Sequence, residues 1–163
     1  MKLPLAVSDF LHRAEFVYGR RVGVVDEPDQ PAESWGELTY ARFAELARAQ
    51  AAGLDRLGVG QGERVAMVTQ NAARLLSSFW GVSGYGRVLV PINFRLNAHE
   101  VGYIVEHSGA SVLLVDPELD DALAEVTAQH RFVIGDESDA VLYRFGETPQ
   151  PWDADEPIDA LRA

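Results

Sequence analysis

The run Gly58-Val59-Gly60-Gln61-Gly62 is the segment of this chain whose composition comes nearest to a phosphate-binding loop. Such a loop needs a strand before it and a helix N-terminus after it, because the backbone amides and the helix dipole must both point at the anion. Here the helical pattern comes first and the strand pattern second. The pattern G-x-x-x-x-G-K-[ST] does not occur, and Lys2 is the only lysine. We therefore predict an ordinary loop that ends a helix.

Residues that could ligate a metal or act as nucleophiles form no catalytic pattern either. No H-E-x-x-H sequence and no G-x-S-x-G elbow occurs, and the chain has no cysteine. Acidic residues 116–121 and 153–159 are typical of solvated surface. The sequence thus predicts no catalytic residue, no metal ligand and four surface or capping histidines: His12, His99, His107 and His130.

The overall charge limits the classes of partner. The net charge is -11 and the isoelectric point is about 4.7, which argues against nucleic acid and anionic membrane as partners. No apolar run reaches the roughly 18 residues of a membrane span. The first 16 residues are too polar for a signal peptide. Together with the absence of cysteine, these features lead us to expect a cytoplasmic protein.

Candidate functional residues depend on the elements that hold them, and the apolar periodicity predicts a regular alternation of those elements. Strands are expected at 22–27, 37–40, 64–70, 87–92, 111–116, 131–136 and, with less support from the pattern, 140–145. Helices are expected at 41–57, 72–84, 98–107 and 117–129, after a short N-terminal helix with Phe10, Leu11, Ala14 and Val17 on one face. This order predicts an α/β fold: a doubly wound, mostly parallel sheet with flanking helices and an N-terminal β-hairpin.

Helix-capping residues support these boundaries. Thr39 and Asn71 are the expected N-caps of the helices 41–57 and 72–84, and Asn97 with Glu100 forms a capping box for the helix 98–107. Gly58 is the expected stop of the helix 41–57. We predict one domain over 1–145, followed by an acidic, proline-rich connector over 146–163.

A phospho-receiver module has a similar size and alternation of elements, and the residues can test it. Asp26, near the end of the first expected strand, could take the place of a receiver's first acidic residue. The strand 87–92, however, leads into Asn93 where a phosphoacceptor aspartate is required, and no late lysine exists. The receiver hypothesis is therefore rejected.

The segment Leu38–Asp116 resembles the N-terminal subdomain of the adenylate-forming superfamily, which includes acyl-CoA synthetases, adenylation domains of peptide synthetases and luciferases. Two runs carry the resemblance: LTYARFAELARAQAAGLDRLGVGQGERVAMVTQN and FWGVSGYGRVLVPINFRLNAHEVGYIVEHSGASVLLVD. The segments PINFRL and HEVGYIVEHSGA are most similar to the corresponding segments of fatty-acyl-CoA ligases. Arg87 stands where a small residue is usual, and Glu63 stands where aspartate is usual.

The resemblance implies a parent enzyme that uses ATP and Mg²⁺ to convert a carboxylic acid into an acyl-adenylate and then transfers the acyl group to CoA. The family's phosphate loop, adenine site and catalytic lysine do not occur in these 163 residues, so the chain is expected to be an inactive N-terminal fragment with no cofactor of its own. The resemblance further implies that Arg95 lies where the CoA nucleotide docks, and a guanidinium suits a phosphate there.

Alternative interpretations stay open at this point. Arg95, with Asn93, could instead only fix the turn between a strand and a helix. Phe79, Trp80 and Tyr103 could border an acyl tunnel, but we expect them to pack in the core. The chain could also be a non-catalytic, stand-alone α/β module that binds a partner or itself, for example as a homodimer through exposed apolar surface.

Overall fold

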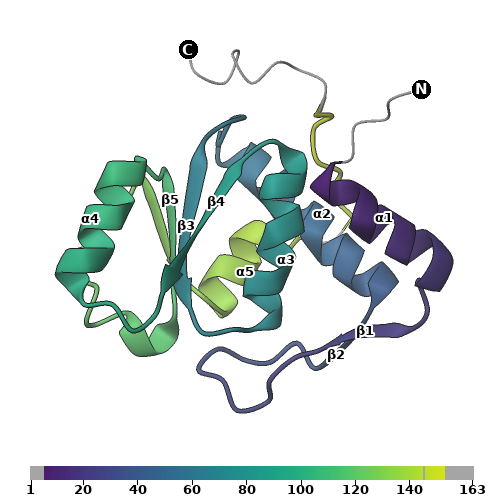
Figure 1. Cartoon of the computed structure of the whole chain (residues 1–163), viewed down its shortest axis with the longest axis horizontal. Helices are drawn as coiled ribbons and strands as arrows, with labels where there is room; N and C mark the ends of the chain where they lie inside the picture. The colour runs from purple at the N-terminus through teal and green to yellow at the C-terminus, as the bar shows by residue number, and fades with distance from the viewer. Residues whose placement is uncertain (1–5, 145, 153–163) are drawn as a thin grey trace.

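The computed structural model describes residues 6–144 and 146–152, and Figure 1 shows a sheet with helices on both of its faces. The helices are α1 (Val7–Tyr18), α2 (Tyr40–Arg56), α3 (Ala73–Gly81), α4 (Ala98–Ser108) and α5 (Asp136–Leu142), with 3-10 turns η1 (Ser83–Tyr85) and η2 (Pro117–Leu119). The strands are β1 (Val22–Val25), β2 (Glu37–Thr39), β3 (Arg64–Thr69), β4 (Val88–Asn93), β5 (Val112–Val115) and β6 (His130–Val133). No helix among the described residues is long and apolar enough to span a membrane.

The main sheet has the strand order β4-β3-β5-β6, and every neighbouring pair is parallel. The helix α3 connects β3 to β4, and α4 connects β4 back across β3 to β5. Because these two connections run in opposite directions along the sheet, α3 and α4 cover opposite faces (Figure 1). β1 and β2 form a separate antiparallel hairpin with an irregularity between Val22 and Val24. The predicted fold class is therefore confirmed.

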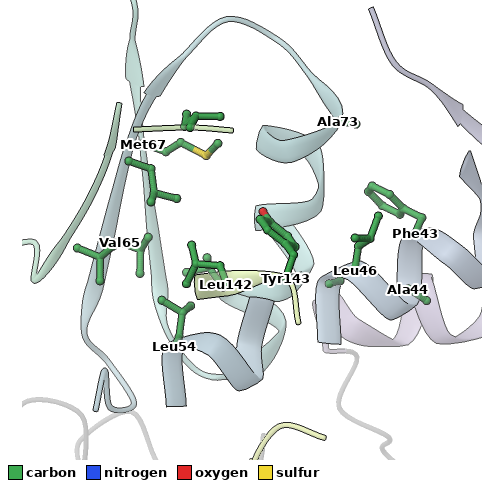
Figure 2. Packing of buried hydrophobic residues seen from close by; sticks show 14 of the residues in the cluster. Phe43, Ala44, Leu46, Leu54, Val65, Met67, Ala73, Leu142 and Tyr143 are labelled. Atoms are coloured by element: carbon green, nitrogen blue, oxygen red, sulfur yellow. The ribbon is translucent and has the colours of Figure 1, made fainter. Parts of the chain in front are cut away.

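The core is divided by the sheet into two clusters, as alternation along the strands requires. Val65 and Met67 of β3 face α2, α3 and α5, where Phe43, Leu54 and Leu142 are buried (Figure 2). The alternate β3 residues, Ala66 and Val68, join the cluster that contains Val101 and Val105 of α4. Because β3 and β5 are buried on both faces, their sequences are almost continuously apolar.

Most predicted helix ends are confirmed. The Thr39 hydroxyl accepts a hydrogen bond from the Arg42 amide at 3.2 Å. Asn97 and Glu100 form the reciprocal capping box at 3.1 and 3.0 Å. Gly58 has a φ of +74°, a conformation that glycine adopts without strain just after a helix.

Asn71 does not cap α3, contrary to the prediction. The N-cap is Ala72, whose side chain cannot accept a hydrogen bond, and the Ala73 amide instead donates to the Asp26 carboxylate at 2.7 Å. A cap supplied from 47 residues away leaves no local sequence signal. The same helix ends at Gly81, before the 3-10 turn η1, and so is shorter than the predicted 72–84.

The predicted helix 117–129 is not present. The 3-10 turn η2 is followed by turns over 120–125, with the Leu123 amide bonded to the Leu119 carbonyl and the Val126 amide to the Leu123 carbonyl, each at 2.9 Å. Leu123 and Val126 are buried in the cluster beside α4. Both apolar side chains are therefore buried without a continuous helix.

The predicted strand 140–145 is also wrong, because its first residues lie in α5. The Asp139 amide bonds to the Gly135 carbonyl at 2.8 Å, and Leu142 and Tyr143 are buried against the larger core cluster. A Cβ on Gly53 of α2 would lie 2.7 Å from the Leu142 Cα, so glycine allows the two helices to approach closely. The strand predicted at 131–136 accordingly ends at Val133.

The predicted apolar face of α1 is buried only in part. Leu11 is buried, whereas Phe10 and Val17 are 65% and 50% exposed. The helix is also held to α2 by a bidentate pair between Glu15 and Arg48, at 2.7 and 2.9 Å. This pair favours the charged guanidinium and raises the pKa of Arg48.

The described part of the C-terminal connector, 146–152, contacts the rest of the domain. The Gln150 amide donates to the Asp55 carboxylate at 2.8 Å, and the same carboxylate pairs with the buried Arg87 guanidinium at 2.6 Å. The rest of the predicted connector, 153–163, lies outside the described residues, and the predicted boundary between 145 and 146 stays a prediction.

Candidate functional site

The turn after β4 carries Arg95, the one candidate binding residue predicted from the sequence. The Asn93 side-chain oxygen accepts a hydrogen bond from the Arg95 amide at 3.0 Å, which fixes the turn between β4 and α4. The Arg95 side chain is exposed, and its guanidinium lies 5.4 Å from the centre of the Phe94 ring. Among the described residues no carboxylate pairs with it. Asn93 therefore shapes the turn through the backbone and leaves the Arg95 guanidinium free for an anion.

Arg95 lies at the carboxyl edge of the sheet, where open parallel sheets bind ligands. Asn93 at the end of β4 pairs in register with Thr69 at the end of β3. The Thr69 hydroxyl donates to the Asp116 carboxylate at 3.0 Å, just beyond β5. Asp116 is 3% exposed and also accepts the amides of Gln70 and Glu118. Its oxygens are therefore committed to holding this edge together.

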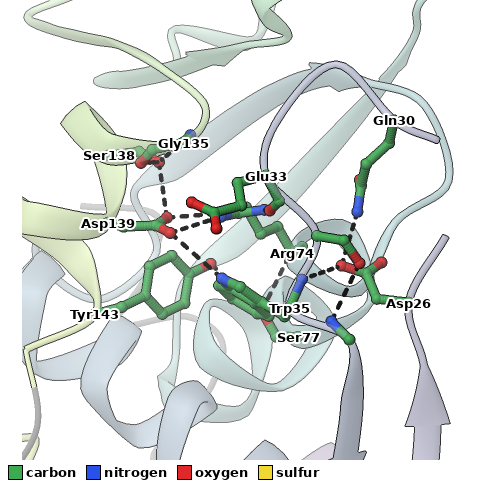
Figure 3. Close-up of polar contacts among 12 residues, drawn as sticks. Asp26, Gln30, Glu33, Trp35, Arg74, Ser77, Gly135, Ser138, Asp139 and Tyr143 are labelled. Carbon is green, nitrogen blue, oxygen red and sulfur yellow. Dashed lines mark hydrogen bonds and ion pairs between the residues drawn. The ribbon is translucent and has the colours of Figure 1, made fainter. Parts of the chain in front are cut away.

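The loop between β1 and β2 is fixed by the buried carboxylate of Asp26, which is 4% exposed (Figure 3). One oxygen accepts the amides of Ala73 and Glu27, at 2.7 and 3.1 Å. The other accepts the Gln30 side-chain amide at 2.8 Å and the Trp35 amide at 2.9 Å. Four N–H donors thus neutralise the cost of burying this carboxylate. Asp26 joins the loop to the N-terminus of α3 and is not an exposed acidic residue of the receiver type.

A second polar cluster centres on Arg74, whose guanidinium is bidentate to Asp139 at 3.1 and 2.6 Å (Figure 3). The third nitrogen group donates to the Glu33 carbonyl at 2.7 Å, and the cation lies 4.6 Å from the centre of the Trp35 ring. The Trp35 indole also donates to Asp139, at 3.3 Å. Arg74 therefore ties α3, α5 and the loop before β2 into one unit.

Tyr143 borders the same cluster. Its hydroxyl lies 3.3 Å from the Ser77 hydroxyl, and its ring packs edge-on against Trp35 at 4.8 Å. Burial raises the pKa of Tyr143 to about 12, partly opposed by the Ser77 hydrogen bond. The phenol is therefore neutral at physiological pH and acts as a packing and hydrogen-bonding group.

The glycine run 58–62 is a loop after α2 and before β3, as predicted. Four of its five amides already have partners. Those of Gly58 and Val59 donate to carbonyls of α2, both at 3.0 Å, and those of Gly60 and Gly62 donate to the Glu63 carboxylate and the Gly86 carbonyl, both at 2.7 Å. Amides that already donate these hydrogen bonds are not available to bind a phosphate. Within the described ranges, no group of three or more acidic or histidine side chains could hold a metal ion.

The aromatic residues expected in the core divide between core and surface. Trp80 packs edge-on against Phe43 at 5.6 Å, so the prediction is confirmed for that residue. Phe79 and Tyr103 are 43% and 62% exposed, and for them the prediction is wrong. Phe79 lies on the outer side of α3, and Tyr103 stacks on His107 at the surface of α4.

Sequence reasoning missed the charged pair of Arg74 and Asp139 and the capping role of Asp26. The residues that form these two contacts are 65 and 47 positions apart in the sequence, so no local spacing predicts either contact. The sequence offered one weak signal: Arg74 is the only charged residue among the apolar positions of 72–82.

These elements define a doubly wound α/β unit whose polar clusters hold the scaffold together and whose exposed Arg95 lies at the carboxyl edge of the parallel sheet. The chain belongs to the family of AMP-binding enzymes, because the model of that family matches residues 13–160. The family match covers most of the chain and agrees with the resemblance found in the sequence.

Two curated relatives and one solved structure illustrate the match. The long-chain-fatty-acid–CoA ligase of Thermus thermophilus is 39% identical over 141 residues, which are 82% of this chain and 25% of the relative. The 4-hydroxybutyrate–CoA ligase 2 of Metallosphaera sedula is 38% identical over 120 residues, 74% of this chain and 21% of the relative. An inhibitor-bound N-terminal domain of FACL13 from Mycobacterium tuberculosis superimposes with a TM-score of 0.79 at 25% identity, over 91% of this chain and 38% of that domain. The chain spans about a quarter of the length of the curated relatives it matches.

Proposed function

We propose that this chain forms the first α/β unit of an acyl-CoA ligase that releases AMP. The observation that carries the proposal is the 39% identity to a long-chain-fatty-acid–CoA ligase across 82% of the chain. A second CoA ligase, for 4-hydroxybutyrate, matches over 74% of the chain, so the reaction type is better supported than the acyl group. A cytoplasmic location belongs to the same proposal, because ATP and CoA are both available in the cytoplasm.

The proposed reaction has two steps. A carboxylate attacks the α-phosphate of ATP, which forms an acyl-adenylate and releases pyrophosphate; the thiol of CoA then attacks the acyl carbon and releases AMP. Such transfers depend on positioning and on stabilisation of phosphate charge. The described residues offer no acidic cluster for Mg²⁺ and no free amide loop for ATP, so we assign neither group to this part of the enzyme.

Within that reaction, this chain would supply the scaffold and one phosphate contact. The Arg95 guanidinium is exposed, free of a carboxylate partner among the described residues, and located at the carboxyl edge of the sheet. These properties suit a contact to a phosphate of CoA. The contact to Asn93 is compatible with this role, because Asn93 binds the Arg95 amide and not its side chain.

A second candidate function is a stand-alone module that binds a partner or a second copy. The observation in its favour is the exposure of Val25, Leu76 and Phe79, which are 70%, 39% and 43% exposed. That exposure is equally expected of a unit that packs against the remainder of a larger enzyme. The identity to ligases therefore makes the first candidate the stronger one.

The test is a chimera in which this chain replaces the matched segment of the Thermus thermophilus ligase. We expect the purified chimera to release pyrophosphate when given ATP, Mg²⁺ and a long-chain fatty acid, whereas the 163-residue chain alone releases none. The host ligase without its own segment is the control. A well-folded chimera that forms no acyl-adenylate would count against the proposed function.

A further inference from the structure

The described part of the C-terminal connector, residues 146–152, lies against the end of α2, and we call this segment the strap. Glu147 forms an ion pair with Arg56, the last residue of α2. Three residues further on, the Gln150 amide donates a hydrogen bond to the carboxylate of Asp55 at 2.8 Å. Two neighbouring residues at the C-terminus of α2 therefore hold the first and middle parts of the strap.

Trp152 holds the other end of the strap. Its ring packs against Gly86, in the turn between η1 and β4, where an added Cβ would lie 2.6 Å from the indole nitrogen. Gly86 also has a φ of +79°, which disfavours any other residue. Trp152 and the loop 58–61 together border a pocket of about 250 Å³. The strap thus bridges the end of α2 and the turn before β4.

Arg87, next to Gly86, is the buried group that links these two contact regions. Its guanidinium donates to the Val59 carbonyl from Nε at 2.9 Å and from Nη2 at 2.7 Å, and Nη2 also donates to Asp55 at 2.6 Å. The Arg87 side chain is 5% exposed and that of Asp55 is 19% exposed. A cation buried to this degree needs a counter-charge and fixed acceptors. Asp55 and the Val59 carbonyl supply them, so the guanidinium has little freedom to move.

The two oxygens of Asp55 are divided between Arg87 and the strap. Oδ1 accepts a hydrogen bond from the guanidinium, and Oδ2 accepts one from the Gln150 amide. Because the guanidinium fixes one oxygen, it also fixes the direction in which the other oxygen points. A carboxylate in the last turn of a helix interacts unfavourably with the helix dipole, and Asp55 lies one residue before the end of α2. The position of Asp55 is therefore explained by its two partners and not by helix stability.

Two simpler explanations account for less. The side chains of Glu147 and Arg56 are 36% and 31% exposed, and ion pairs at this exposure contribute little. Fold stability alone does not require Arg87 either, because apolar residues of similar volume often stabilise a buried site as well as an ion pair does. An apolar residue, however, cannot orient the Asp55 carboxylate.

We infer that Arg87 is a positioning residue that orients Asp55 to latch the strap onto α2, and that this latch determines where the chain leaves the domain after Trp152. The inference concerns residues of this chain alone and does not depend on the proposed function. Loss of the guanidinium should release the strap, even though none of the described hydrogen bonds joins Arg87 to the strap directly.

The experiment measures, by NMR, the exchange of the Gln150 amide hydrogen with water in the folded 163-residue chain. The variant Arg87→Met keeps much of the side-chain volume and removes the charge. We expect exchange at Gln150 to accelerate by at least about tenfold, because a hydrogen bond to a charged group contributes that much or more. The amides of Val82 and Val101, whose hydrogen bonds belong to α3 and α4, are the reference amides and should keep their wild-type rates.

Arg131→Met is the matched control, because it removes an arginine whose partner, Asp120, takes no part in the contacts of the strap. It should leave exchange at Gln150 unchanged. Arg87→Lys serves if Arg87→Met does not fold. A lysine ammonium lacks the planar fork that binds two acceptors in fixed directions, so exchange at Gln150 should still rise, by about threefold.

A double variant separates a latch from a loss of overall stability. Asp55→Ala removes the acceptor itself, and adding Arg87→Met to it should produce no further acceleration at Gln150, since both changes act on one contact. Additive accelerations would overturn the inference, because Arg87 would then act through another contact. An unchanged rate at Gln150 in the folded Arg87 variants would overturn it as well. So would an equal acceleration at the two reference amides, which would show that the whole domain opens.

Discussion

Arg74 and Asp139 form a bidentate ion pair, at 3.1 and 2.6 Å, that joins α3 to α5 across 65 residues of sequence. The Arg74 side chain is 4% exposed and that of Asp139 is 27% exposed. The pair also positions Trp35 and, through the Glu33 carbonyl, the loop before β2. It is therefore the main polar link between the hairpin loop, α3 and the C-terminal helix.

Asp139→Ala should destabilise the chain markedly, because it leaves the buried Arg74 cation without its counter-charge. We expect the free energy of unfolding to fall by about 3 kcal/mol, the low end for a broken buried pair since Asp139 is partly exposed. Urea unfolding measures the change. The control is Asp120→Ala, which breaks the more exposed pair with Arg131 and should cost less than about 1 kcal/mol. Equal losses in the two variants would contradict the role given to Arg74.

Gly81→Ala should disturb the contact between α3 and α2. A Cβ at this position would lie 2.3 Å from the Gln50 side-chain oxygen and 2.8 Å from the Ala47 carbonyl oxygen. Because a backbone atom cannot move aside easily, we expect a loss of about 1–3 kcal/mol in unfolding free energy. At Gly60 an added Cβ meets nothing within 4 Å, so Gly60→Ala should be neutral or slightly stabilising. Similar melting temperatures for the two variants would show that the α2–α3 contact is looser than described.

The stability of the chain should fall at alkaline pH through Tyr143. The folded-state pKa of Tyr143 is about 12 and the unfolded value is close to 10, so the unfolded chain loses its proton first as the pH rises. The contribution is fully present below pH 10 and is lost between pH 10 and 12, at about 1.4 kcal/mol per pH unit at most. Denaturant unfolding of Tyr143→Phe should show a shallower fall over this range. Tyr103→Phe, at an exposed position, should keep the wild-type slope; if it flattens the slope equally, Tyr143 is not the cause.

Arg95→Ala in the chimera should weaken the use of CoA and leave adenylation intact. An exposed phosphate contact contributes about 1 kcal/mol, so the KM for CoA should rise about fivefold while pyrophosphate release in the absence of CoA stays unchanged. Arg95→Lys should recover part of the loss, because it keeps the charge. Arg20→Ala, at another exposed arginine, is the matched control. An unchanged KM for CoA would leave Arg95 without a binding role.

The fold could be predicted from the sequence where the signal is local. Buried strands such as 64–70 and caps such as Thr39 and Asn97 follow from apolar runs and from side chains that bond their own backbone a few residues on. The prediction failed where distant residues decide the outcome. The cap of α3 comes from Asp26, and Val141 and Leu142, predicted to lie in a strand, pack against Gly53 of α2 instead.

The candidate site shows the same division. The turn around Arg95 was predictable because Asn93 and the capping box lie within five residues of it. The surroundings of Arg74 and Asp26 were not, because each has partners both in the β1–β2 loop and in a helix that is distant in sequence from that loop (Figure 3). The exposure of Phe79 was also missed, because an apolar residue in an amphipathic helix is normally assigned to the core.

Formation of acyl-CoA by the chimera tests the central claim most directly. The claim is that this chain supplies the first α/β unit of an acyl-CoA ligase. The assay supplies a long-chain fatty acid, ATP, Mg²⁺ and CoA and measures the acyl-CoA and AMP that form. The Thermus thermophilus ligase is the reference. We predict acyl-CoA and AMP in equal amounts, at a rate within about tenfold of the reference, since this chain is 39% identical to the reference over the matched residues. A chimera that folds cooperatively but forms no acyl-CoA would contradict the claim.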